Sequence, residues 1–86
     1  MSAFVATIHV RPKAEIRDPQ GEAVAVALRS LGVAVDDVRI GKEIVVRFSA
    51  DDAAAARADA DKMGDELLAN PVIEDFTVDV SEAGGA

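Results

Sequence analysis

The chain has 86 residues, of which 50% are hydrophobic, and its formal net charge at pH 7 is −7. This length suits one domain spanning residues 1–86 and is too short for two. A domain of this size buries only about 60% of its unfolded surface, so we expect an oligomer to complete the core. The acidic balance argues against a nucleic-acid partner, because phosphate binding needs a cationic surface. The absence of cysteine excludes disulfides, a thiol nucleophile and a cysteine-ligated metal.

The first ten residues, MSAFVATIHV, do not resemble a signal peptide, because no basic segment precedes a sustained apolar stretch. No apolar run approaches the ~20 residues that a membrane-spanning helix needs. We therefore expect a cytoplasmic protein.

An alternating pattern predicts a first strand over residues 3–11. Its core-facing residues are Phe4, Ala6, Ile8 and Val10. Pro12 ends the strand because it has no N–H to donate. His9, the only histidine, falls on the outward face. A catalytic or metal-binding role would need converging partners, which one imidazole does not supply, so we expect a half-exposed strand residue.

A helix is predicted to begin at Asp18-Pro19-Gln20-Gly21. Asp18 can cap the free amides, and Pro19 suits the first helical position, where its missing N–H is not needed. Gly32 supplies a left-handed C-cap. The spacing of the apolar residues between them predicts a stripe along one face of the helix, formed by Val24, Ala27, Leu28 and Leu31.

Residues 36–48 form a central stretch that allows two interpretations. Its apolar residues share one parity and would lie on one face of an extended chain: Val38, Ile40, Ile44, Val46 and Phe48. A hairpin with a three-residue loop would place Ile40 opposite Ile44. A long strand bent at Gly41 would instead give its two halves to two sheets or two subunits. Unbroken parity and the lack of Asn-Gly or Asp-Gly favour the long strand.

A second helix is predicted to begin within residues 49–52, where Ser49 and Asp52 resemble a weak capping box. Asn70-Pro71 ends this helix, because the residue before a proline avoids the α region. The inward residues of the helix are expected to be Ala53, Ala56, Ala60, Met63 and Leu67. A last strand follows over residues 72–80 with Phe76, Val78 and Val80 inward, and residues 81–86 are expected to fray.

These elements predict a small two-layer α+β domain of order β-α-β-α-β, with both helices on one face of a sheet that contains antiparallel pairs. Glycine-rich phosphate motifs, a calcium loop and a nucleophile elbow are all absent from the sequence, so we expect no catalytic, cofactor-binding or metal-binding residue. A small basic cluster consists of Arg39, Lys42 and Arg47. These residues either pair with acidic neighbours such as Asp37 and Glu43 or dock an acidic patch on a partner.

Three motifs give the chain a family resemblance over nearly its whole length: DPQGEAV at residues 18–24, VRIGKEI at residues 38–44 and LLANPVIEDF at residues 67–76. In order and spacing they resemble the PurS family, the small subunits of phosphoribosylformylglycinamidine synthase in purine biosynthesis. The resemblance implies a homo-oligomeric, dimeric or tetrameric bridge between a synthetase subunit, which would hold ATP and magnesium, and a glutaminase subunit that supplies ammonia. The complex would be a glutamine-dependent, ATP-consuming ligase.

Matching the motifs gives a set of structural or interface candidates: Asp18, Pro19, Gln20, Gly21, Arg39, Gly41, Lys42, Asn70, Glu74 and Asp75. The alternative function is a free-standing ferredoxin-like module that binds a small regulatory molecule. That module should bind an effector on its own, whereas a bridging subunit should bind its partner subunits and show no activity alone.

Overall fold

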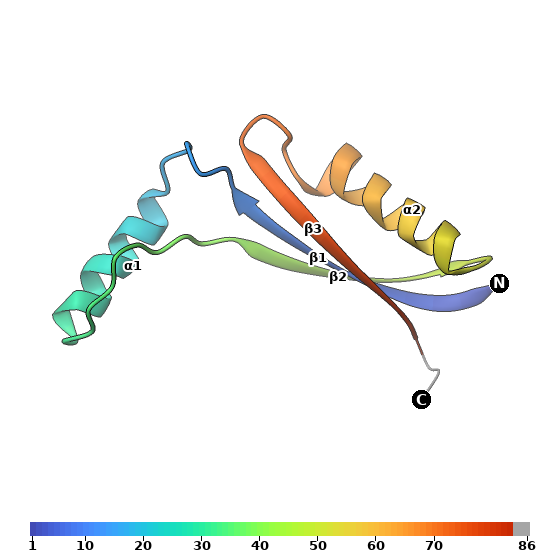
Figure 1. Ribbon diagram of the computed structural model, residues 1–86, viewed down its shortest axis with the longest axis horizontal. Helices are drawn as coiled ribbons and strands as arrows, with labels where there is room; N and C mark the ends of the chain where they lie inside the picture. The colour runs from blue at the N-terminus through green and yellow to red at the C-terminus, as the bar shows by residue number, and fades with distance from the viewer. Residues whose placement is uncertain (84–86) are drawn as a thin grey trace.

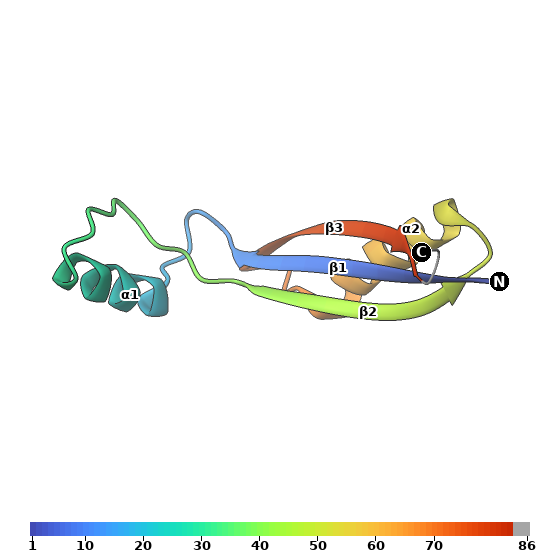
Figure 2. The same ribbon diagram turned by 90° about the horizontal axis from the view of Figure 1, so that it is seen from below.

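The computed structural model describes residues 1–83, which form a three-stranded antiparallel sheet of order β2-β1-β3 and two α-helices (Figure 1). The elements are β1 (Ser2–Pro12), α1 (Pro19–Ser30), β2 (Lys42–Ala50), α2 (Ala53–Met63), a short π-helix η1 (Gly64–Leu68) and β3 (Glu74–Glu82). The predicted α+β class and element order are confirmed. Figure 2 looks onto the open face of the sheet, where the strands lie side by side with α2 behind them.

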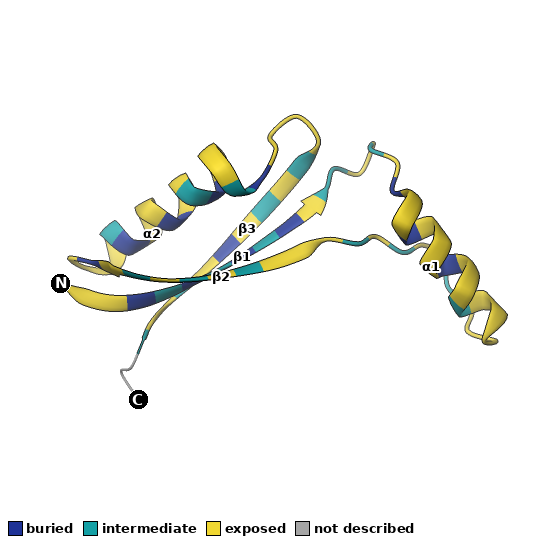
Figure 3. Ribbon diagram, turned by 180° about the vertical axis from the view of Figure 1, so that it is seen from behind, coloured by how far each residue is buried: buried dark blue, intermediate teal, exposed yellow. Residues whose placement is uncertain are grey.

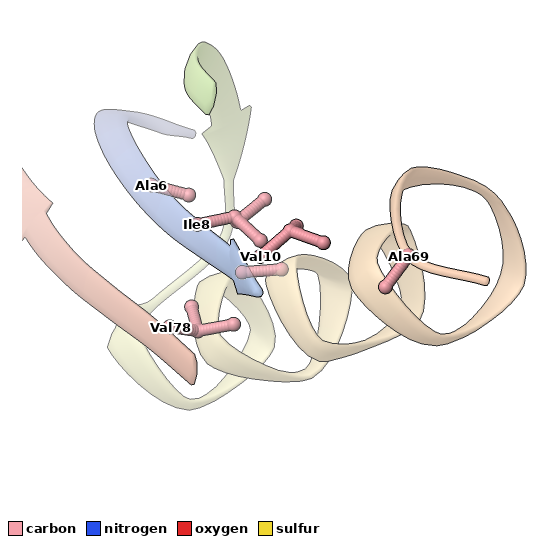
Figure 4. Packing of buried hydrophobic residues seen from close by; sticks show 6 residues of the cluster. Ala6, Ile8, Val10, Ala69 and Val78 are labelled. Atoms are coloured by element: carbon pink, nitrogen blue, oxygen red, sulfur yellow. The ribbon is translucent and has the colours of Figure 1, made fainter. Parts of the chain in front are cut away.

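The core lies between the sheet and α2, and the inward residues of β1 form its centre (Figure 4). Ile8, fully buried, pairs with Ile44 on β2 and with Val78 on β3. Phe4 pairs with Phe48 in the same register. The shared face predicted for Ile44, Val46 and Phe48 is therefore confirmed. Val38 and Ile40, predicted on the same face, lie before β2 in irregular backbone.

Helix α2 packs on the sheet through small residues, since Ala56 and Ala60 are both fully buried. Its N-cap is Asp52, whose carboxylate accepts the amide of Ala55 at 2.8 Å. The predicted capping box is wrong, because Ser49 still belongs to β2. The prediction that Leu67 faces inward is also wrong. Leu67 is 82% exposed, and Leu68 packs against the core instead. The amide of Ala69 bonds the carbonyl of Gly64 in a π-turn, which shifts the helix register by one residue.

Helix α1 does not pack on the sheet, so the prediction of two helices on one face is wrong (Figures 1 and 2). It projects beyond the end of the sheet, and its only buried residues are Gly21 and Ala25. Both predicted ends of the helix are confirmed. Asp18 caps the start. Gly32 has φ 87° in a Schellman turn, in which the backbone amide of Val33 donates a hydrogen bond to the carbonyl of Leu28 at 3.1 Å.

The hairpin interpretation of the central stretch is wrong, because β2 begins at Lys42 and pairs with β1. Residues 33–41 run in irregular backbone toward β2 and belong to no strand of this chain. The long-strand interpretation holds only for the second half of the stretch, which forms β2 and pairs with β1. The first half, residues 36–41, forms no strand within this chain.

Strand β3 begins two residues later than predicted and extends to Glu82, so Ser81 and Glu82 are part of the sheet. The amide of Ala83 donates to the carbonyl of Ala3, which holds the end of β3 against β1. The prediction of a frayed tail from residue 81 is therefore wrong for its first part, and its last part, residues 84–86, lies outside the described residues. The start of β3 is delayed because a turn at residues 70–74 precedes the strand.

The molecule is elongated, with principal extents of 51 × 32 × 13 Å. Its radius of gyration is 16.5 Å, whereas a compact domain of 86 residues has about 12 Å. The projecting helix accounts for this shape, which Figure 3 also shows as a contrast in burial: α2 has a buried stripe toward the sheet, and α1 is mostly exposed.

Candidate functional site: the neck and the β3 turn

Helix α1 is joined to the sheet by two crossing segments, residues 13–18 and residues 38–41, which we call the neck. Asp18 is the buried residue that ties them together. Its carboxylate accepts the amide of Gly21 at 2.8 Å, as the helix cap, and the amide of Ile40 at 2.7 Å, from the other segment. These hydrogen bonds, first that of Ile40 and then that of Gly21, hold the pKa of Asp18 below its usual value.

Arg39 closes the neck from the second segment. Its guanidinium donates to the carbonyls of Lys13 at 2.8 Å and Ile16 at 2.7 Å. Neither predicted role of Arg39, pairing with Asp37 or docking an acidic partner, accounts for these bonds. In this fold Arg39 ties the second segment of the neck to the first.

Glycine is needed at two positions where the backbones of the neck approach closely. A Cβ at Gly21 would lie 2.2 Å from the carbonyl oxygen of Val38, and one at Gly41 would lie 2.3 Å from that of Val10. Both obstacles are backbone atoms, which cannot rotate away as a side chain can. The DPQGEAV and VRIGKEI motifs are therefore two halves of one junction.

The remaining neck candidates are exposed. Pro19 occupies the first turn of α1, as predicted. Gln20, in the first turn of α1, and Lys42, the first residue of β2, line a hollow of about 250 Å³ together with Gly41 and Glu74. They are therefore available for contact with another molecule, whereas Asp18 and Arg39 are engaged within the chain.

The other three candidates lie in the turn that precedes β3, residues 70–74, which we call the β3 turn, and at its junction with the strand. Asn70 donates its amide to the Glu74 carboxylate at 2.7 Å and accepts the amide of Val72 on its own side chain at 3.0 Å. Asp75 pairs with Lys13 at 2.9 Å. Lys13 also donates its amide to Ile73. Sequence analysis missed Lys13, since nothing along the chain links it to a turn about sixty residues away.

The chemistry offered by residues 1–83 is limited. His9 is half-exposed on the open face, where its two ring nitrogens lie 3.8 Å from Glu43 and 3.5 Å from Asp79 on opposite strands. Because the carboxylates lie on opposite sides of the ring, they do not converge on one point. Within these residues, no three histidine or carboxylate side chains are placed to hold a metal ion, and no helix is long and apolar enough to span a membrane.

Known relatives match most of the chain. A subunit PurS of phosphoribosylformylglycinamidine synthase from Mycobacterium leprae is 45% identical and aligns with 85% of this chain and 90% of its own length. The corresponding subunit from Synechocystis is 41% identical over 92% of this chain and 80% of the relative.

Solved structures confirm the fold. PurS from Thermus thermophilus superimposes with a TM-score of 0.87 at 40% identity, covering 93% of this chain and 96% of that one. A chain in the structure of PurLQS from Thermotoga maritima gives a TM-score of 0.83 at 35% identity, covering 95% and 99%. Residues 5–82 match the family profile described as PurS, phosphoribosylformylglycinamidine (FGAM) synthase. This chain therefore belongs to the PurS family and is a subunit of phosphoribosylformylglycinamidine synthase in purine biosynthesis.

Proposed function

We propose that the chain is the non-catalytic small subunit of the synthase, which bridges the synthetase and glutaminase subunits in the cytoplasm and supports the transfer of glutamine-derived ammonia. ATP and magnesium would then be held by the synthetase subunit. The relative from Thermotoga maritima is part of a PurLQS structure, which supports assembly with two further kinds of subunit.

The observation that carries this proposal is the elongated shape. A radius of gyration of 16.5 Å leaves an apolar helix, an open sheet face and two sheet edges accessible to other chains. The neck and the β3 turn are held by internal hydrogen bonds, so these surfaces keep fixed positions. Such a molecule is suited to positioning other proteins.

The experiment mixes purified synthetase and glutaminase subunits with and without this chain and measures glutamine-dependent turnover. We expect turnover with glutamine to require the chain, whereas free ammonia should support the synthetase reaction without it. Turnover with glutamine that is equally fast without the chain would contradict the proposal. Binding of a small effector by the chain alone would instead support the ferredoxin-like alternative.

We also propose that the chain forms a homo-oligomer through α1 and residues 33–41. The turn that ends α1 has exposed apolar residues that the chain itself does not cover: Leu31 is 78% exposed and Val33 is 48% exposed. Residues 33–41 form no strand, and the outer edge of β2 has no partner among the described strands. An extended segment and a free strand edge are the two components of an added β-ladder.

The groove between α2 and β2 would receive the helix of the second copy. Its volume is about 510 Å³, and Phe48 and Met63 contribute its apolar lining. Residues 33–41 of one copy would extend the sheet along β2 of the other, while α1 would pack its stripe into this groove. Each copy has both the groove and the segment that would fill it, namely α1 with residues 33–41, so a two-fold axis would satisfy both contacts at once.

Light scattering of a Leu31→Ser, Val24→Ser double variant tests this assembly. Both residues lie on the apolar stripe of α1, so we expect the variant to dissociate at concentrations where the unsubstituted chain is oligomeric. Val26→Ser is the matched control, because Val26 is 61% exposed but lies on the opposite side of the helix. An unchanged mass for the double variant would exclude α1 from the interface.

A further inference from the structure

The end of the sheet that faces α1 carries a basic hollow, where β1 ends and β2 begins (Figure 1). Its volume of about 320 Å³ is at the lower end of the roughly 300–1,000 Å³ that small-molecule sites have. Arg11 from β1, Lys42 from β2 and Arg39 from the neck line it, together with His9. One small space is thus bordered by three side chains with a permanent positive charge.

Arg11 and Lys42 have no acidic partner within residues 1–83. With 16 acidic and nine basic residues, the chain offers every cation many possible partners. The lysine and arginine ion pairs of the described chain, 2.9 to 3.9 Å long, engage other residues: Lys13, Arg17, Arg57 and Lys62. Asp75 lies opposite Arg11 in the register of β1 and β3, but it binds Lys13 at 2.9 Å. Lys42 lies opposite the apolar Val10, so both cations keep their charge for another molecule.

Arg39 is held in place without losing its charge. Its guanidinium donates to the carbonyl oxygens of Lys13 and Ile16, which carry no net charge. Glu43 is the one carboxylate among the described residues that line the hollow, and it lies 3.8 Å from Nδ1 of His9. The hollow is therefore positive on balance, and a pocket lined by one sign of charge concentrates ions of the opposite sign.

The hollow lies apart from the surfaces that we assign to a second copy. His9, Val10 and Arg11 belong to the central strand β1, so the hollow lies over the β1–β2 pair and not at the outer edge of β2. The groove proposed for α1 is lined by residues of α2 and of the far end of β2, such as Met63 and Phe48. A small ligand in the hollow would leave both surfaces open.

Phosphate is the anion that suits three cations from three segments of the chain. It has up to two negative charges and oxygen acceptors in several directions, whereas a carboxylate has one charge and two oxygens. The forked guanidinium of arginine matches phosphate geometry, and lysine adds a point charge. We infer that this hollow binds a phosphate group, either free or carried by a small phosphorylated molecule. The inference goes beyond the proposed function, because neither bridging nor oligomerisation requires a ligand on this chain.

The test follows the backbone amide signals of the full chain by NMR while inorganic phosphate, adenosine monophosphate or adenosine is added. We expect saturable shifts at residues 40–43 with both phosphate-containing probes and none with adenosine. Equal affinities would indicate free phosphate as the ligand, and an affinity about fivefold higher for the nucleotide would indicate a phosphorylated molecule.

Charge-removing variants assign the binding to the hollow. We expect Lys42→Gln to weaken phosphate binding by roughly tenfold, and the double variant Arg11→Gln, Lys42→Gln to abolish it. Arg47→Gln is the matched control, because Arg47 is an exposed arginine on β2 that lies opposite Val5 and outside the hollow. It should bind phosphate within about twofold of the unsubstituted chain. Glu43→Gln should bind about two- to threefold more tightly, since a like charge is removed from the hollow.

The inference would be overturned by the absence of saturable phosphate binding to the unsubstituted chain or by unchanged binding to the double variant. An equal loss in Arg47→Gln would overturn it too, because it would indicate only general attraction between charges. The chain is measured alone, so these results are independent of glutamine-dependent turnover, which tests the proposed function. A chain that binds phosphate and is required for turnover is a subunit with a ligand site. Phosphate binding by a chain that turnover does not require would instead fit the ferredoxin-like module.

Discussion

The two α-helices of this small subunit differ in a way that reverses the usual relation between hydrophobicity and burial. Helix α2 is rich in alanine and aspartate, yet it packs on the sheet with Ala56 and Ala60 completely buried. Helix α1 has the larger apolar side chains, and Leu31 at its C-terminal end is 78% exposed. The more apolar helix is therefore the one that the chain leaves uncovered.

Side-chain size explains why α2 packs on the sheet although it has few large apolar residues. Alanine lets the helix approach the sheet closely, so that Ile8 and Val10 fill the space between the layers. Helix α1 is held too far from any sheet of its own chain to do the same. The comparison implies that the sheet with α2 holds its own core, whereas within the chain α1 is stabilised by its caps and by the neck.

The largest effect should come from Ile8→Ala in the core between the sheet and α2. Ile8 is fully buried at the centre of the sheet, so truncation removes apolar contacts and leaves a cavity. We expect the free energy of unfolding to fall by about 3 kcal/mol, as measured by denaturant titration. Val26→Ala on α1, at an exposed position, should change it by less than about 0.5 kcal/mol. Equal losses at both sites would show that the two regions do not differ in this way.

The next effect should appear at the neck with Gly41→Ala. The new methyl group would collide with the carbonyl oxygen of Val10, so the two backbones must separate. We expect a loss of about 2 kcal/mol in the free energy of unfolding, together with weaker oligomerisation, because α1 would be displaced. Gly32→Asn is the control: Gly32 has φ 87°, the space that a Cβ would take there is open, and asparagine tolerates that conformation. A stable Gly41→Ala chain with an unchanged oligomer would contradict the neck's role.

Sequence rules for helix caps and strand periodicity correctly predicted the features that depend only on neighbouring residues. The cap at Asp18, the left-handed turn at Gly32 and the inward residues of β1 follow from propensity and period, and all three are confirmed. The exposure of α1 could not be predicted from its apolar stripe, because such a stripe shows that a helix packs on something but not on which chain. The exposure of Leu67 was missed for another reason: a π-turn changes the period that the prediction depends on.

The candidate residues illustrate the same limit. Gly21 and Gly41 were recognisable as special positions, but their shared cause, two backbones crossing at the neck, exists only in three dimensions. The charge of Arg39 suggested a surface role, whereas its guanidinium binds two carbonyls of a loop more than twenty residues earlier. Sequence spacing does not reveal such long-range pairings.

A smaller, pH-dependent effect is expected at Asp18. Its pKa is lower in the folded chain than in the unfolded chain, so the ionised carboxylate stabilises the fold above about pH 4, and this contribution is lost as the pH falls through the folded pKa. Asparagine keeps only one acceptor oxygen for the amides of Gly21 and Ile40. We expect Asp18→Asn to lower Tm at pH 7 by roughly 5 °C. The difference from the unsubstituted chain should shrink below pH 4, and a constant difference would exclude the ionised carboxylate as its cause.

The smallest effect on stability should come from Asp75→Asn. The Lys13–Asp75 pair is short at 2.9 Å, and its hydrogen bond raises the pKa of Lys13, but Asp75 is 61% exposed. Water and salt screen such a pair, so we expect Tm to change by no more than about 2 °C in a thermal melt. The backbone bond from Lys13 to Ile73 would keep the β3 turn in place. If Tm fell much further, the stability of the fold would depend on this pair. If Tm were unchanged and binding to the synthetase or the glutaminase subunit weakened, the carboxylate would serve the assembly rather than the fold.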